Sequence, residues 1–154
     1  MFLSELGAND ERFKGAQFSD GLNLILSAKT DEAGPGESRN STGKSSFVWI
    51  LRYLLGGNIP TDVKTETLQE HVFRAKLTFS TTEGPRELQV KRRVSPQTKL
   101  LVENGPNGSG WEETHIDQWR SFVASALFRI PSELSRPTPG QIWGQFIRNS
   151  FKTP

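Results

Sequence analysis

A run of small, polar and basic residues at positions 38–46 has the clearest chemical pattern in this chain. Its letters, SRNSTGKSS, match the phosphate-binding pattern G-x-x-x-x-G-K-[ST] at Gly43, Lys44 and Ser45 and depart from it at Ser38, where the pattern has glycine. In such a loop the backbone N–H groups surround phosphates, the lysine reaches the β- and γ-phosphates, and the serine hydroxyl binds Mg²⁺. The pattern therefore predicts a site for nucleotide phosphates and Mg²⁺.

The sequence around this run predicts the strand and the helix that such a loop needs. A short apolar run before it, typical of an interior strand, consists of Leu22, Leu24, Ile25 and Leu26. After it, residues 44–55 are apolar on nearly all sides and predict a buried helix. Gly56 and Gly57 are expected to end that helix, because glycine adopts the left-handed conformation found at many helix ends. The alternative is a surface turn that precedes a core helix.

Nine residues are candidates for contact with the nucleotide, and Ser45 is also a candidate Mg²⁺ ligand. Seven belong to the loop and the start of the helix: Asn40, Ser41, Thr42, Gly43, Lys44, Ser45 and Ser46. Arg12 and Lys14 precede the apolar run with Phe13 between them, which predicts cations and a ring near the nucleotide. From spacing alone, an edge strand with solvated charges explains these two cations more simply.

The composition bounds the protein class without identifying a partner. The chain has 154 residues, 34% of them hydrophobic, and a net charge of +2, which indicates neither disorder nor a polyanion partner. The absence of cysteine excludes disulfides and thiolate metal sites. No apolar stretch is long enough to span a membrane and the first residues do not resemble a secretion signal. We expect a cytoplasmic single domain with no membrane partner.

Residues 28–37 are rich in Gly, Pro and charge, and we expect them to form an inserted mobile loop. Short strands are expected at 1–6 and 12–18, with a polar turn at 7–10. From 71 to 102 apolar and polar residues alternate, and turn residues lie at 82–85, which predicts an antiparallel meander with one wet face. Arg92 interrupts its apolar face.

The wet face of the predicted meander carries a basic stripe of Arg74, Lys76, Lys91 and Arg93. Such a stripe is typical of a surface that meets nucleic-acid phosphates. Solvated cations on an exposed sheet explain it more simply without a partner, because the net charge of the chain is close to zero.

Two helices are expected after the meander. The first covers 115–128, with Thr114 as N-cap, Asp117 in its first turn, and an apolar face made of Ile116, Trp119, Val123, Ala126 and Leu127. Pro131 is expected to end it, and a last helix is expected to begin at 138–141. After the loop, no apolar strand ends in Asp or Glu, so we expect no catalytic residue in this chain. His71 and His115 are too unsupported to predict a metal site.

The order of these features resembles the N-terminal lobe of ABC-type ATPases of the SMC, RecF and RecN group. The likeness rests on Arg12-Phe13-Lys14, residues 21–25, the loop 40–45 and a helix that ends in Leu54-Leu55-Gly56-Gly57. It is closest to poorly characterised bacterial SMC-like ATPases with short coiled coils, some of them found in ABC-three-component systems. The likeness is specific over 21–57 and looser from 71 to 152.

The resemblance implies an α/β (α+β) fold: the half-head of a P-loop NTPase, with an antiparallel β subdomain and flanking helices. Residues 1–154 would form a single ATP-binding lobe that ends before a coiled coil. A second lobe, in cis or in trans, would supply the signature motif and the acidic residues for hydrolysis. The resemblance also implies that two such heads form a head-to-head dimer and that the protein acts on DNA, in repair or defence.

The resemblance also assigns a role to one glutamine. Gln141, or with less support Gln145, would correspond to the Q-loop residue that senses Mg²⁺ and the γ-phosphate. A local capping box at 138–141 explains Gln141 equally well. Two other functions stay open: a stand-alone P-loop enzyme such as a small-molecule kinase, and a non-catalytic nucleic-acid-binding module.

Overall fold

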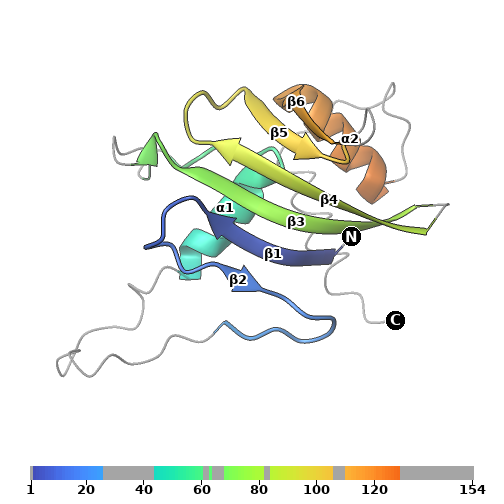
Figure 1. Cartoon of the computed structure of the whole chain (residues 1–154), viewed down its shortest axis with the longest axis horizontal. Helices are drawn as coiled ribbons and strands as arrows, with labels where there is room; N and C mark the ends of the chain where they lie inside the picture. Colours follow the sequence, from blue (N-terminus) through green and yellow to red (C-terminus); the bar gives the residue numbers. More distant parts are fainter. Residues whose placement is uncertain are drawn as a thin grey trace.

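A computed structural model describes residues 2–25, 44–60, 63, 68–81, 84–105 and 110–128. Their elements are β1 (Phe2–Ala8), β2 (Ala16–Gln17), α1 (Lys44–Leu54), β3 (Val72–Thr81), β4 (Gly84–Arg93), β5 (Lys99–Glu103), β6 (Trp111–His115) and α2 (Ile116–Phe128). The strands form one antiparallel sheet in the order β2-β1-β3-β4-β5-β6 (Figure 1). Both helices share a single apolar core with the sheet. The described chain is therefore a mixed α+β structure.

The predicted alternation of β3 and β4 is confirmed. The inward side chains of β3 are Phe73, Ala75, Leu77 and Phe79, all buried. Val90 lies opposite Ala75 and Leu88 lies opposite Leu77, so that the two strands present one apolar face to the helices. The opposite face of the sheet, which we call the open face, carries the polar residues of the alternation.

The strands differ from the sequence prediction at four places. β1 extends to Ala8, and β2 consists only of Ala16–Gln17 instead of 12–18. Gly84 and Pro85, predicted as turn residues, are the first residues of β4, where they pair with Thr81 and Ser80. β6 was not predicted, because its five residues WEETH show no apolar alternation.

The prediction of an interior strand at 22–26 is wrong over its described part. Residues 22–25 form no strand, and the side chains of Leu22, Leu24 and Ile25 are 86%, 71% and 43% exposed. The Asn23 side chain instead stabilises a local turn, accepting from the Ser19 backbone N–H at 2.9 Å and donating to the Ser19 carbonyl at 2.8 Å. An interior strand needs a neighbouring strand, and none of the described strands pairs with this segment.

The predicted first helix of the C-terminal part is confirmed as α2, but its N-cap is not Thr114. Thr114 lies in β6, where its side chain is buried. The capping acceptor is His115, whose Nδ1 lies 3.4 Å from the backbone N–H of Asp117. Ile116, Trp119 and Val123 are buried as predicted. A strand that leads directly into the helix moves the cap by one residue.

Several expectations concern residues outside the described part of the chain. These are the inserted loop 28–37, the loop residues Asn40, Ser41, Thr42 and Gly43, the helix expected from 138, and Gln141 and Gln145. No helix in the described ranges has the length and apolar character needed to cross a membrane.

Candidate functional site

Helix α1 begins at the lysine of the phosphate-binding pattern. Lys44 is its first residue, followed by an exposed Ser45 and a half-buried Ser46, and its first turn contains no acidic residue. The first N–H groups of a helix lack intrahelical partners and carry the positive end of the helix dipole. With no carboxylate in this turn to neutralise it, the beginning of α1 is suited to a phosphate group.

One side of α1 is buried against the sheet and the other is not. Ile50, Tyr53 and Leu54 are buried in the core, whereas Ser45 and Arg52 are exposed and Val48 is 55% exposed. The prediction that this helix is buried on nearly all sides is therefore wrong. Because residues three and four apart share a helix face, Ser45, Val48 and Arg52 form one continuous exposed stripe that begins at the phosphate-binding pattern.

The end of α1 forms the glycine stop that the sequence predicts. Gly56 has a φ of 100°, in the left-handed region. The N–H of Gly56 donates to the Tyr53 carbonyl at 3.0 Å, and the N–H of Gly57 donates to the Arg52 carbonyl at 2.9 Å. These two bonds make a Schellman motif, which satisfies the last carbonyl groups of a helix.

Three side chains from other elements bind the remaining carbonyl groups at this end. Trp119 Nε1 of α2 donates to the Leu54 carbonyl at 2.7 Å, and Arg120 Nε donates to the Gly56 carbonyl at 2.8 Å. Arg92 of β4 donates to the Tyr53 and Gly57 carbonyls. The positive charges of Arg92 and Arg120 also interact favourably with the negative end of the helix dipole. The end of α1 is thus held by β4 and α2.

Arg92, which interrupts the apolar alternation of β4, is buried together with its charge. Its guanidinium lies over the Tyr53 ring, 3.8 Å from the ring centroid, and its Nη2 also donates to the Gln97 carbonyl at 2.6 Å. Burial lowers the pKa of Arg92 to about 10, because the charged form loses its water contacts. In the described part of the chain, carbonyl groups and a ring offset that loss, and no carboxylate pairs with Arg92.

Aromatic rings join the turn after β1 to the beginning of α1. The Phe13 ring lies 5.6 Å from Phe47 and 6.0 Å from Phe73, and Trp49 meets Phe73 edge to face at 5.3 Å. Figure 1 shows this turn on the side of the molecule where α1 begins. Phe13 places this segment against the first turns of α1. That Arg12 and Lys14 lie near a bound nucleotide stays a prediction.

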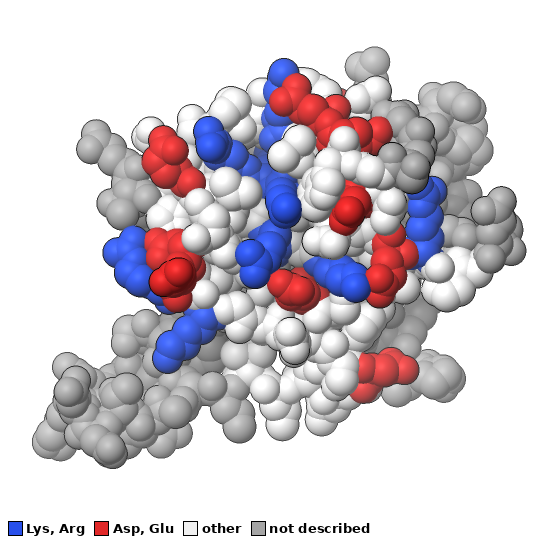
Figure 2. Space-filling model, in the orientation of Figure 1, with Lys and Arg blue, Asp and Glu red and all other residues white. Residues whose placement is uncertain are grey.

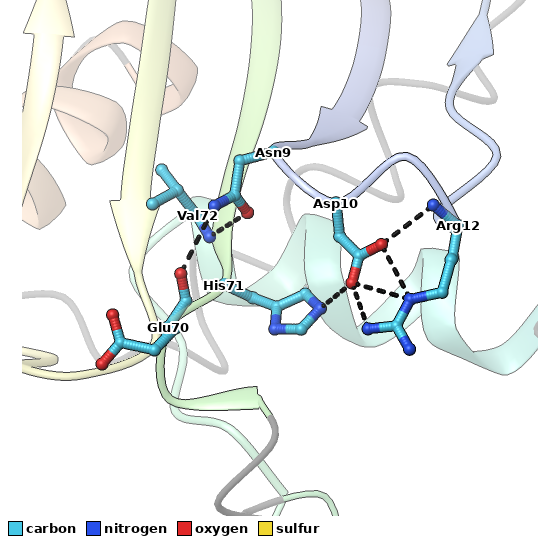
Figure 3. Close-up of polar contacts among 6 residues, drawn as sticks. All are labelled: Asn9, Asp10, Arg12, Glu70, His71 and Val72. Carbon is cyan, nitrogen blue, oxygen red and sulfur yellow. Dashed lines mark hydrogen bonds and ion pairs between the residues drawn. The ribbon is translucent and has the colours of Figure 1, made fainter.

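A polar cluster of Asp10, Arg12 and His71 occupies the same turn (Figure 3). Asp10 accepts from the Arg12 backbone N–H at 2.9 Å, from Arg12 Nε at 3.0 Å and from Arg12 Nη2 at 2.6 Å. His71 Nε2 lies 2.9 Å from Oδ2 of the same carboxylate, the oxygen that also accepts from Arg12 Nη2. The hydrogen bonds from Arg12 hold the pKa of Asp10 well below its usual range, so this carboxylate is ionised.

Neighbouring bonds attach this cluster to the beginning of β3. The Asn9 side chain accepts from the Val72 backbone N–H at 2.8 Å and donates to the Glu70 carbonyl at 3.4 Å (Figure 3). Because an ionised carboxylate can only accept, His71 Nε2 is the donor to Asp10. His71 Nδ1 is buried and has no hydrogen-bond partner among the described residues.

The sequence singled out Arg12 and Lys14 but neither Asp10 nor His71. Lys14 is exposed, and no ion pair of its side chain is seen among the described residues. Asp10 stands two positions before Arg12. This spacing could have predicted their contact, since Asp side chains often bind the backbone N–H two residues further along the chain. His71 is 61 positions from Asp10, and the pairing of β1 with β3 is what brings them together.

The predicted basic stripe lies on the open face, where two of its four cations form ion pairs and a third lies over an aromatic ring. Arg74 Nε binds Glu5 at 3.2 Å, Lys76 binds Glu87 at 2.8 Å, and Lys91 lies 3.9 Å over the Trp111 ring. In Figure 2 the basic side chains gather along the middle of the visible face with acidic ones on both sides. A face neutralised in this way attracts phosphates weakly.

Among the described residues, no three His, Cys, Asp or Glu side chains are grouped closely enough to hold a metal ion. No family model matches the chain, and neither does a curated protein or a solved structure.

Proposed function

We propose that the chain is the ATP-binding N-terminal lobe of an SMC-like P-loop ATPase, which hydrolyses ATP only when a second lobe completes the site. The observation that carries this proposal is the start of α1. The G-K-S of the phosphate-binding pattern leads into a core helix whose first turn is free of acidic residues. Phe13 packs the segment of Arg12 and Lys14 against the same end.

The residues at this end fit MgATP. Lys44 would bind the β- and γ-phosphates, and Asn40 to Ser46 would contribute backbone N–H groups. The exposed Ser45 hydroxyl is a hard oxygen ligand of the kind that Mg²⁺ prefers, and Gln141 would be a further ligand of the ion. Bound Mg²⁺ would offset the charge of the phosphates.

Two exposed apolar surfaces support the need for a second lobe. Leu22, Leu24 and Ile25 follow the edge strand β2 and are exposed, Leu22 and Leu24 over most of their surface, and Val48 is exposed on α1. Grouped apolar side chains on a surface often mark a place where another protein segment binds. A second lobe, in cis or in trans, would cover them and supply the acidic residues for hydrolysis; dimerisation of two heads and action on DNA belong to the same proposal.

Binding of MgATP, measured by calorimetry on the full chain, tests this proposal. We expect the unaltered chain to bind MgATP, and Lys44→Ala to weaken binding at least tenfold, the effect of losing one charge-assisted phosphate contact. Lys99→Ala, which removes a lysine from β5, serves as the matched control and should bind like the unaltered chain.

Phosphate release, followed in the same samples, separates the proposal from its main alternative. A half-site binds ATP without turnover. Sustained turnover by this chain alone would instead favour a stand-alone kinase-like enzyme. Equal affinities for the unaltered chain and Lys44→Ala, or no binding at millimolar MgATP, would refute the proposed site.

A further inference from the structure

The turn between β1 and β2 holds one arginine in an unusual way. Arg12 is 79% exposed, which for most arginines means a mobile side chain, yet its backbone N–H, Nε and Nη2 all bind one carboxylate. Among the described residues its Nη1 has no hydrogen-bond partner. Asp10 therefore occupies one edge of the guanidinium and leaves the other edge available.

We propose that Asp10 and His71 are positioning residues for Arg12, and that they hold its free Nη1 edge ready to bind a phosphate oxygen of the nucleotide. This inference rests on the proposed function, because the phosphate belongs to the same nucleotide. It adds a residue pair that the phosphate-binding pattern does not contain.

Asp10 is suited to this role because it is itself held in place. Its side chain is only 18% exposed, and Oδ2, which accepts from Arg12 Nη2, also lies 2.9 Å from His71 Nε2. His71 directly precedes β3, which lies in the interior of the sheet order, and its backbone N–H and carbonyl both make hydrogen bonds. The Asp10 and His71 side chains thus fix the guanidinium of Arg12 relative to the sheet.

Phe13 places this arginine near the start of α1. The Phe13 ring meets Phe47 at 5.6 Å, and Phe47 is three residues, about 4.5 Å of helix rise, from Lys44. A guanidinium is suited to phosphate because its N–H groups form a planar fork. An arginine that is already ordered loses less side-chain entropy when it binds, which raises affinity without a new contact.

The effect of neutralising Asp10 has opposite signs under two explanations. If Asp10 acts only through its charge, Asp10→Asn removes a negative charge near the phosphates and should tighten ATP binding. If it positions Arg12, the same substitution releases the guanidinium and should weaken binding. The sign therefore separates positioning from simple electrostatics.

The experiment is calorimetric titration of the full chain with MgATP. We expect Arg12→Gln to weaken binding about tenfold, close to the lower end for one hydrogen bond to a charged group. Asp10→Asn should weaken it about fivefold, because the guanidinium remains but is no longer held in place. In the Arg12→Gln background Asp10→Asn should add less than about twofold, because the residue it positions is gone. Glu11→Gln is the matched control: it removes the same charge from an exposed neighbour with no bond to Arg12, and should not weaken binding.

A pair of His71 variants keeps the test valid if Asp10→Asn does not fold. His71→Gln retains a side-chain donor for Asp10 and should bind MgATP within about twofold of the unaltered chain. His71→Leu removes the donor and should weaken binding by about threefold or more. Circular dichroism of each variant before titration confirms that it is folded.

The outcomes distinguish this inference from the proposed function. Binding that is lost in Lys44→Ala but is unchanged or tighter in Asp10→Asn overturns the positioning role and leaves the nucleotide site in place. Additive effects of Asp10→Asn and Arg12→Gln overturn it as well. If the unaltered chain binds no MgATP, both are refuted.

Discussion

Arg92 provides the sharpest test of how the helix that carries the candidate site is held. We predict that Arg92→Met destabilises the fold, although the substitution places an apolar side chain of similar length in a buried position. Arg92 is 1% exposed, and its guanidinium binds the carbonyl groups of Tyr53, Gly57 and Gln97. Methionine fills much of the same space but donates no hydrogen bond.

Two opposing contributions, the interactions of the guanidinium and the cost of burying its charge, determine how much Arg92→Met destabilises the fold. Three hydrogen bonds from a charged donor contribute about 5 kcal/mol at the lower end of their range, and the contact with the Tyr53 ring contributes about 1 kcal/mol more. Against this, the fall in the pKa of Arg92 to about 10, caused mainly by desolvation, corresponds to a net cost of roughly 3 kcal/mol for the charged form. The hydrogen bonds exceed this cost, so we expect Arg92→Met to lower the free energy of unfolding by about 2–4 kcal/mol.

Urea unfolding followed by tryptophan fluorescence measures this difference. Arg93→Met is the matched control, because Arg93 is the next residue of the same strand and is exposed on the open face. Its substitution should change the free energy of unfolding by less than about 0.5 kcal/mol. A loss below about 1 kcal/mol for Arg92→Met relative to Arg93→Met would refute the reasoning, since the desolvation cost would then nearly balance or outweigh the three hydrogen bonds.

Two further predictions concern the glycine stop of α1 and the carboxylate of the candidate site. Gly56→Ala should lower the free energy of unfolding by about 1–3 kcal/mol, because a Cβ at a φ of 100° is strained and would lie 2.8 Å from Arg120 Cγ; an unchanged urea midpoint would contradict this. Asp10→Asn should cost stability at neutral pH, and the gap to the unaltered chain should close as the pH falls below about 4. The pKa of Asp10 is depressed below 3.8 by its bonds to Arg12 and His71, so its stabilisation is present above that pH and is lost as the carboxylate protonates. Unfolding midpoints between pH 7 and pH 2 measure the gap, and a gap that widens in acid would contradict the assignment.

Local patterns predicted much of the fold. The apolar run after Lys44 and the glycine pair predicted α1 to within one residue of its observed end at Leu54, because helix period and left-handed glycine are properties of neighbouring residues. The alternation in β3 and β4 predicted their buried face for the same reason. The G-K-S pattern predicted a phosphate site at the start of this helix, which stays a prediction.

The wrong predictions share one cause: each of these features depends on residues that are distant in the chain. Leu22 and Ile25 have the composition of an interior strand, but whether such a strand is buried depends on a neighbouring strand. Arg92 looked like an interruption of an apolar face, and only the approach of α1 and the turn after β4 provides the carbonyl groups that accept its N–H groups. Val48 is exposed because the sheet covers one side of α1 and no described element covers the other.

The sequence by itself determined where α1 begins and ends and which side chains of β3 and β4 face inward, since periodicity and glycine geometry act over a few residues. Only the tertiary structure decided which groups meet across the sheet. The pairing of β1 with β3 brings Asp10 to His71 and so gives Arg12 a fixed partner. A side chain's chemistry depends on its neighbours in space, and those neighbours are set by the pairing of strands rather than by adjacency in the chain.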